Sequence, residues 1–193
     1  ARAFVVFRTD CLMALKATIF KADINISDMD RGYYAGHTLT IARHPSENDE
    51  RMMLRIAAFA LHADEQLSFT KGLCADDEPE LWRKNYSDEI ELWIDLGEPD
   101  EKRLRKACGR ADQVWLYCYG GRASEIWWQG MQGKASRFTN LTVVSIPPDT
   151  LQQLTTLTER SMQLQATIQD GQMWLSSGER SVLVEGAFWQ RSQ

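Results

Sequence analysis

The sequence lacks the features of a membrane-spanning chain. None of the apolar runs in its 193 residues approaches the ~18 residues that a helix needs to cross a bilayer. Residues 1–12 also lack the basic start and long apolar core of a secretory leader. We therefore expect a cytoplasmic protein with no membrane partner.

The motifs of several enzyme classes are missing as well. There is no glycine-rich phosphate loop and no GxSxG turn, and the three histidines are not spaced as metal ligands. The cysteines form no CxxC pair, and we interpret them as reduced structural thiols. They are Cys11, Cys74, Cys108 and Cys118. Carboxylates are left as the candidate chemical groups.

A basic surplus is also absent, because the net charge is −5. Proteins that coat nucleic acid nonspecifically usually carry excess positive charge, since phosphate neutralisation supplies their affinity. The net charge therefore argues against a protein that covers nucleic acid nonspecifically, but it is compatible with a local basic groove.

The length and composition suit one packed domain. Hydrophobic residues make up 44% of the chain, which includes seven tryptophans and seven phenylalanines. Met13 reads like a natural start, so we interpret residues 1–12 as an extraneous extension and residues 13–193 as a single domain. We favour a monomer, although the sequence does not determine the oligomeric state.

Apolar periodicity predicts a mixed α/β chain. A helix at 46–63 is apolar on nearly every side, so we expect it at the centre of the domain, with Ser46 as its N-cap. The middle of the chain reads helix, strand, strand, strand, helix, strand, at 46–63, 67–74, 80–85, 89–96, 99–108 and 113–119. Gly109 is expected to stop the second helix. The outer strands are expected to pair with each other, at 14–26, 37–42, 161–168, 172–175 and 181–188.

The stretch from Asp76 to Arg110 separates charges by sign. Residues 76–101 hold eleven acidic and two basic residues, whereas residues 102–110 hold five basic residues and no acidic one. Carboxylates on adjacent strands beside a basic helix are the parts of a metal-dependent phosphodiester site. They are equally the parts of a solvated hairpin followed by a helix whose charges match its dipole.

Long segments of the sequence identify a family. They include ARHPSENDERMMLRIAAFALHADEQLSFTKGLCADDEPELW, ELWIDLGEPDEKRLRKA and MQLQATIQDGQMWLS. Through them the chain closely resembles the bacterial YaeQ family over residues 13–190. The resemblance implies a PD-(D/E)XK nuclease-like core of order αβββαβ, with additional β-strands from both termini. It implies no established activity, since fold fixes function poorly.

The resemblance also implies candidate metal ligands. In the nuclease superfamily, carboxylates on the second and third core strands bind Mg²⁺. Glu80, after Pro79, matches the first of these positions, and Asp95 matches the second. Hard Mg²⁺ prefers oxygen ligands and keeps several waters for chemistry.

One position departs from the superfamily pattern. Gly97 stands where the superfamily places a lysine two residues after the second carboxylate. Either Lys102 or Lys106 of the next helix supplies the missing cation, or the site has no such base.

Glu50 is the third catalytic candidate. At a helical period it shares the interior stripe of Leu54 and Ala57, where a carboxylate needs a partner. A metal shared with Glu80 and Asp95 would supply one, and so would a structural ion pair with Arg43, Arg51 or Arg55. Glu47 is explained by helix capping alone.

Two functions follow from these observations. The first is a Mg²⁺-dependent phosphodiesterase or nuclease acting on nucleic acid. The second is a non-catalytic protein that keeps the nuclease fold and binds protein or nucleic acid, with Trp127 and Trp128 as a contact surface.

Overall fold

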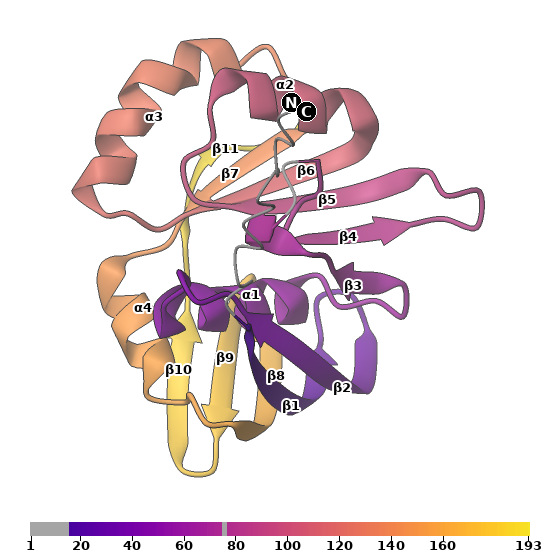
Figure 1. Cartoon of the computed structure of the whole chain (residues 1–193), viewed down its shortest axis with the longest axis vertical. Coiled ribbons are helices and arrows are strands. Elements are labelled where there is room, and N and C mark those ends of the chain that lie inside the picture. Colours follow the sequence, from indigo (N-terminus) through magenta and orange to yellow (C-terminus); the bar gives the residue numbers. More distant parts are fainter. Residues whose placement is uncertain (1–15, 75–76) are drawn as a thin grey trace, which may run out of the picture.

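In the part of the chain that the structure describes, the fold is a mixed α/β arrangement of two sheets and four helices (Figure 1). The computed structural model describes residues 16–74 and 77–193, so the expected extension at 1–12 lies outside the described residues. The helices are α1 (Asp49–Leu61), α2 (Glu101–Arg110), α3 (Arg122–Ala135) and α4 (Pro148–Thr155), with a short 3₁₀ turn at Gly72–Cys74. The strands are β1 (Thr18–Asp28), β2 (Tyr33–Arg43), β3 (Leu67–Phe69), β4 (Leu81–Lys84), β5 (Ile90–Leu96), β6 (Ala111–Cys118), β7 (Leu141–Ser145), β8 (Ser161–Gln169), β9 (Gln172–Ser177), β10 (Arg180–Val184) and β11 (Ala187–Gln190).

Strands from both ends of the chain form the five-stranded sheet, in the order β10-β9-β8-β1-β2. β1 pairs antiparallel with β2 and parallel with β8. Along β1 the buried residues alternate with exposed ones, because only one face of this sheet is covered. The expectation that the outer strands pair with each other is confirmed.

The six-stranded sheet has the order β11-β7-β6-β5-β4-β3. Its strands β5, β6 and β7 are parallel. Helices α2 and α3 connect them and lie together on one face of the sheet, at the top of Figure 1. This face holds a second apolar core, which includes Trp93, Leu104 and Leu116.

Helix α1 lies between the two sheets (Figure 1). Ten of its thirteen residues are buried, among them Met52, Met53 and Phe59. A helix that is apolar on nearly every side can only be accommodated in this position. The predicted central helix is therefore confirmed.

Several boundaries differ from the sequence expectations. The expected strand at 67–74 ends at Phe69, and Gly72–Cys74 form a 3₁₀ turn instead. The N-cap of α1 is Asn48 rather than Ser46, because the Asn48 side chain accepts a hydrogen bond from the Arg51 backbone N–H. Gly109 does not stop α2, which continues to Arg110. The expected strand 181–188 is two strands in different sheets, and the chain crosses between the sheets near Gly186.

Candidate functional site

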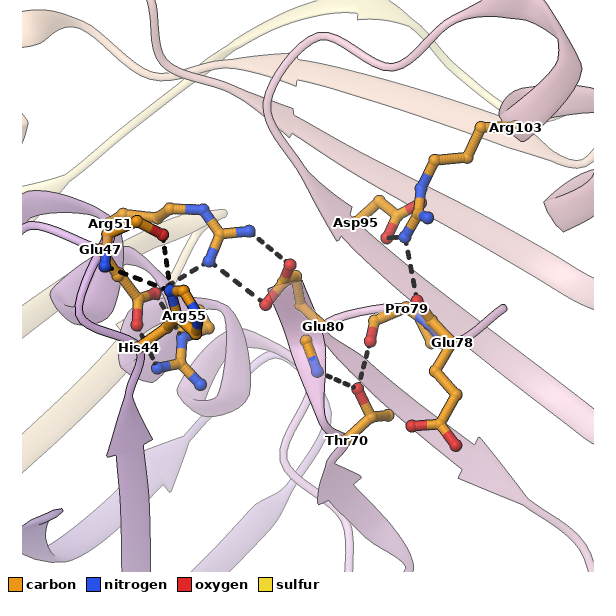
Figure 2. A network of polar contacts seen from close by, with 12 residues as sticks. His44, Glu47, Arg51, Arg55, Thr70, Glu78, Pro79, Glu80, Asp95 and Arg103 are labelled. Atoms are coloured by element: carbon orange, nitrogen blue, oxygen red, sulfur yellow. Dashed lines mark hydrogen bonds and ion pairs between the residues drawn. The ribbon is translucent and has the colours of Figure 1, made fainter. Parts of the chain in front are cut away.

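Glu80 lies immediately before β4 with a buried carboxylate. Its backbone N–H donates to the Ile94 carbonyl at 2.9 Å, and its own carbonyl accepts from the Thr70 N–H at 3.1 Å. The residue is only 4% exposed. Both carboxylate oxygens accept from the Arg51 guanidinium, Oε1 from Nη2 in a close contact and Oε2 from Nη1 at 3.4 Å (Figure 2).

Arg51 joins Glu80 to a second buried acid, Glu47. Its Nη1 donates to Glu47 Oε1 at 2.8 Å. Arg55, one helical turn further on, donates to the same carboxylate from Nε at 2.8 Å and from Nη2 at 2.6 Å. Two acids and two arginines therefore form one neutral, buried chain of ion pairs between α1 and β4.

The environment of Arg51 keeps it charged. Burial alone would lower the pKa of its guanidinium, but the Glu80 carboxylate raises this pKa well above its ordinary value, and Glu47 adds to the effect. An unpaired buried charge is costly, so loss of either acid would leave an uncompensated arginine.

Asp95 on β5 is held by a different arginine. Nε of Arg103 donates to Oδ2 at 2.9 Å, and its Nη2 donates to Oδ1 at 2.8 Å. The same Nη2 donates to the Glu78 carbonyl at 2.9 Å, as Figure 2 shows. Arg103 is in the first turn of α2, where Asp100 caps the helix. A bidentate guanidinium thus occupies the carboxylate face that a metal would need.

Gly97, where the resemblance led us to look for a lysine, directly follows β5 and has a backbone φ of 98°. L side chains rarely adopt this conformation, so a lysine here would be strained. The glycine is explained by the turn that leads from β5 into α2.

Glu80 and Asp95 line one cavity of about 220 Å³ together with Arg51 and Arg103. A neighbouring cavity of about 460 Å³ shares Arg51 and Glu80. Across residues 16–74 and 77–193, however, no group of three or more His, Cys, Asp or Glu side chains is placed to hold a metal ion. The structure therefore brings Glu80 and Asp95 to one cavity but does not add a third acidic ligand.

The remaining candidates lie apart from this cavity. Glu50 is half-buried rather than interior, and within the described part of the chain no hydrogen bond or ion pair involves its side chain. Lys106 pairs with Asp77 at the surface. Lys102 is exposed and lines a groove of about 420 Å³ with Arg103 and Lys106.

The arginine partners of these acids are not evident from the sequence. Arg51 and Arg55 were weighed as partners of Glu50, but they bind Glu47, which helix capping was expected to explain. Arg103 was not singled out at all. Because Asp95 and Arg103 belong to different elements, only the way β5 packs against α2 brings them together.

A broad groove separates α2 from α3. It has a volume of about 620 Å³, and its lining holds three basic and three acidic residues beside Trp127: Lys102, Arg105, Lys134, Glu98, Asp100 and Glu101. The indole N–H of Trp127 donates to the Pro99 carbonyl at 3.1 Å. Trp128 stacks instead on Trp189, with ring centroids 5.6 Å apart.

Comparisons with known proteins agree on one family. The family model described as "YaeQ protein" matches residues 13–186. The chain is 51% identical to "Uncharacterized protein YaeQ" of Escherichia coli (strain K12), over 93% of this chain and 99% of that protein. The protein of the same name from Salmonella typhi is 50% identical, again over 93% of this chain and 99% of that protein.

Solved structures give the same result. The crystal structure of YaeQ from Xanthomonas axonopodis pv. citri has a TM-score of 0.86 at 46% identity, covering 90% of this chain and 98% of that one. The crystal structure of YaeQ from Pseudomonas syringae has a TM-score of 0.87 at 32% identity, and the match covers 91% of this chain and 97% of that one. No helix among the described residues is long and apolar enough to span a membrane. By sequence and by structure alike, the chain belongs to the YaeQ family.

Proposed function

We propose that this protein keeps a nuclease-like core but is non-catalytic, and that it binds single-stranded nucleic acid beside α2. The order α1, β3, β4, β5, α2 and β6 supports a PD-(D/E)XK-type core, since it is the order that such a core requires. Acidic side chains of that core would be metal ligands in an enzyme. Here Glu80 and Asp95 are each bound by an arginine.

The observation that carries the proposal is the pairing of both candidate ligands. Glu80 is bound by Arg51, and Asp95 is bound by Arg103 through two parallel hydrogen bonds. Mg²⁺ requires oxygen ligands that are free to coordinate it. The donor set therefore does not fit Mg²⁺ in this arrangement, and Gly97 offers no base beside it.

The basic side of α2 supports binding to phosphates. This helix has five basic residues and one acidic residue, and Leu104 and Ala107 face the core. The outward-facing cations are exposed, and they are Lys102, Arg105, Lys106 and Arg110. Arg105 and Lys106 form ion pairs with Glu101 and Asp77 at the surface, where such pairs are weak enough for a phosphate to replace the carboxylate. Trp127 of α3 lies in the adjoining groove, where its ring can stack on an unpaired base.

Binding can be tested with a fluorescently labelled oligothymidylate of about 20 nucleotides, a length that covers one or more binding sites. We expect saturable anisotropy at low salt that weakens as salt rises. The double variant Lys102→Ala/Arg105→Ala should lower the salt slope by about 1.4, since each phosphate contact to a single strand contributes about 0.7. The control Lys21→Ala/Arg180→Ala removes two charges from the five-stranded sheet and should leave binding unchanged. An absence of binding, or an equal loss in both double variants, contradicts the proposal.

The metal-dependent alternative has its own test. Calorimetric titration with Mg²⁺ and Mn²⁺ should give no binding heat if the arginines keep Glu80 and Asp95 occupied. If a metal binds, if labelled DNA or RNA is cleaved, and if Asp95→Ala abolishes both, the protein is instead a phosphodiesterase. Glu80 and Asp95 would then be its ligands, and Glu50, Lys102 and Lys106 would be the next residues to vary.

A further inference from the structure

A separate cavity lies where the two sheets meet, away from the ion pairs around Glu80. It has a volume of about 180 Å³. One wall comes from the six-stranded sheet, with Trp115, Tyr117 and Val144, and the opposite wall comes from Ile168 and Val184 of the five-stranded sheet. His62, which directly follows α1, closes the inner end.

Four rings surround this cavity. The His62 ring meets the face of Trp115 edge-on, with centroids 4.6 Å apart. Trp115 also stacks near Tyr117 at 6.1 Å and meets Phe188 edge-on at 6.1 Å. These are the offset and edge-to-face geometries that aromatic rings prefer, so an aromatic ligand in the cavity would meet rings able to make the same kinds of contact.

A single polar pair faces the rings. His62 Nε2 and the Tyr117 hydroxyl share a hydrogen bond of 2.6 Å. One hydrogen-bonding function of the Tyr117 oxygen remains after this bond is made, because a phenol can both donate and accept. Tyr117 itself is 2% exposed, so a partner for that function must come from within the cavity.

Charged groups are absent from the walls. Among the described residues that line the cavity, none is an acid, a lysine or an arginine. Burial, with smaller contributions from Arg31 and Arg83, lowers the pKa of His62 to about 3 and keeps its ring neutral. A cationic ligand would meet no counter-charge here, and an anionic ligand would be desolvated without a partner.

The cavity is open on one side. Phe188 and Gly171 lie at this rim, and both are exposed. At Gly186 the backbone passes so close to Val144 and Ile146 that an added Cβ would overlap with both side chains. Glycine therefore allows the crossing from β10 to β11 to form part of the wall while leaving the cavity unfilled.

We propose that this cavity binds a small neutral aromatic molecule carrying one hydroxyl group, which hydrogen-bonds to the Tyr117–His62 pair. The size agrees, because an engineered apolar cavity of about 150 Å³ holds benzene. The four rings supply stacking and edge contacts, and the polar pair selects for the hydroxyl. This site is independent of the nucleic-acid proposal, since the two share no residue.

Phenol is the probe, and toluene is its isosteric comparison without the hydroxyl. A ligand of about seven heavy atoms has a Kd in the millimolar range, so the titration extends to about 20 mM. We expect phenol to shift the Trp115 indole N–H resonance in a saturable way. Toluene should bind about two- to tenfold more weakly, the factor that one net hydrogen bond provides.

Two variants locate the binding. Phe188→Ala removes an exposed rim ring and should weaken phenol binding at least about threefold, whereas Tyr86→Ala removes an aromatic residue that is 99% exposed on the β4–β5 turn and should have no effect. Unshifted thermal midpoints would confirm that both variants fold. The proposal is overturned if phenol gives no saturable shift, if toluene binds equally well, or if Tyr86→Ala has the same effect as Phe188→Ala.

Discussion

Asp95 and Arg103 are joined side to side, with two parallel N–H···O bonds of 2.9 and 2.8 Å. The carboxylate is almost fully buried, whereas 29% of the arginine side chain is exposed. This ion pair connects the start of α2 to the end of β5. It gives Asp95 a structural role that needs no metal.

Removing the arginine should therefore destabilise the fold. Arg103→Ala leaves a buried carboxylate without its guanidinium, and we expect a loss of about 2 kcal/mol in the free energy of unfolding. Removing one partner of a fully buried ion pair costs ~3–5 kcal/mol. The loss is smaller here because water partly screens Arg103. Urea denaturation measures the change. Arg105→Ala breaks only an exposed pair with Glu101 and should cost less than about 0.5 kcal/mol. Equal losses in the two variants would mean that the Asp95 pair is no stronger than a surface pair.

The start of α1 offers a test of cap position. Asn48→Ala removes the side chain that accepts from the Arg51 N–H, so we expect a loss of about 1 kcal/mol. Ser46→Ala, at the cap position that the sequence favoured, should change the free energy of unfolding by less than about 0.5 kcal/mol. Chemical denaturation of both variants decides between the two caps, and a larger loss at Ser46 would restore the sequence-based assignment.

These two sites show what the sequence could predict. The apolar period of 52–61 placed α1 at the centre, and alternation in the region of β1 identified the first of the outer strands, because periodicity follows directly from which face is buried. The N-cap was misplaced by two residues, since Ser46 and Asn48 are both good caps. The cap position matters for the site, because it leaves Glu47 outside the helix and turned toward the interior, where Glu50 had been expected.

The ion pairs were less predictable for a different reason. Glu80 and Arg51 are 29 residues apart, and only the packing of α1 against the region of β4 brings them together. Single-sequence patterns report local periodicity and carry no information about such long-range pairs. The split of 181–188 is also non-local, since it depends on the close passage of Gly186 beside Val144.

Gly186 is expected to be intolerant of any side chain. Gly186→Ala would force a Cβ against Val144, Ile146 and the Ser145 carbonyl, and we expect a loss of about 1–3 kcal/mol. Gly130→Ala is the matched control, because it lies in α3 with nothing within 4 Å of an added Cβ. It should stabilise by about 0.5–1 kcal/mol through the better helix propensity of alanine. Thermal unfolding compares the two, and a neutral Gly186→Ala would show that the β10–β11 crossing can relax.

His62 should make the fold sensitive to mild acid. Its pKa falls from an ordinary 6.5 to about 3 in the folded chain, first because of burial and then because of Arg31 and Arg83. Between these two values the unfolded chain binds a proton that the folded chain does not, so the free energy of unfolding decreases as pH falls from 6.5 toward 3. The slope is up to about 1.4 kcal/mol per pH unit, or about 2 kcal/mol between pH 7.5 and 5.0.

Two variants separate this effect from other titrations. His62→Gln should lose that share of the pH dependence, measured by urea denaturation at pH 7.5 and 5.0. Tyr117→Phe removes the hydrogen bond to His62 but keeps the ring buried, so it should be less stable at both pH values and retain the wild-type difference between them. Because burial is the main cause of the lowered pKa, a loss of the difference in Tyr117→Phe would show that the hydrogen bond dominates instead. An unchanged difference in His62→Gln would place the acid sensitivity elsewhere in the chain.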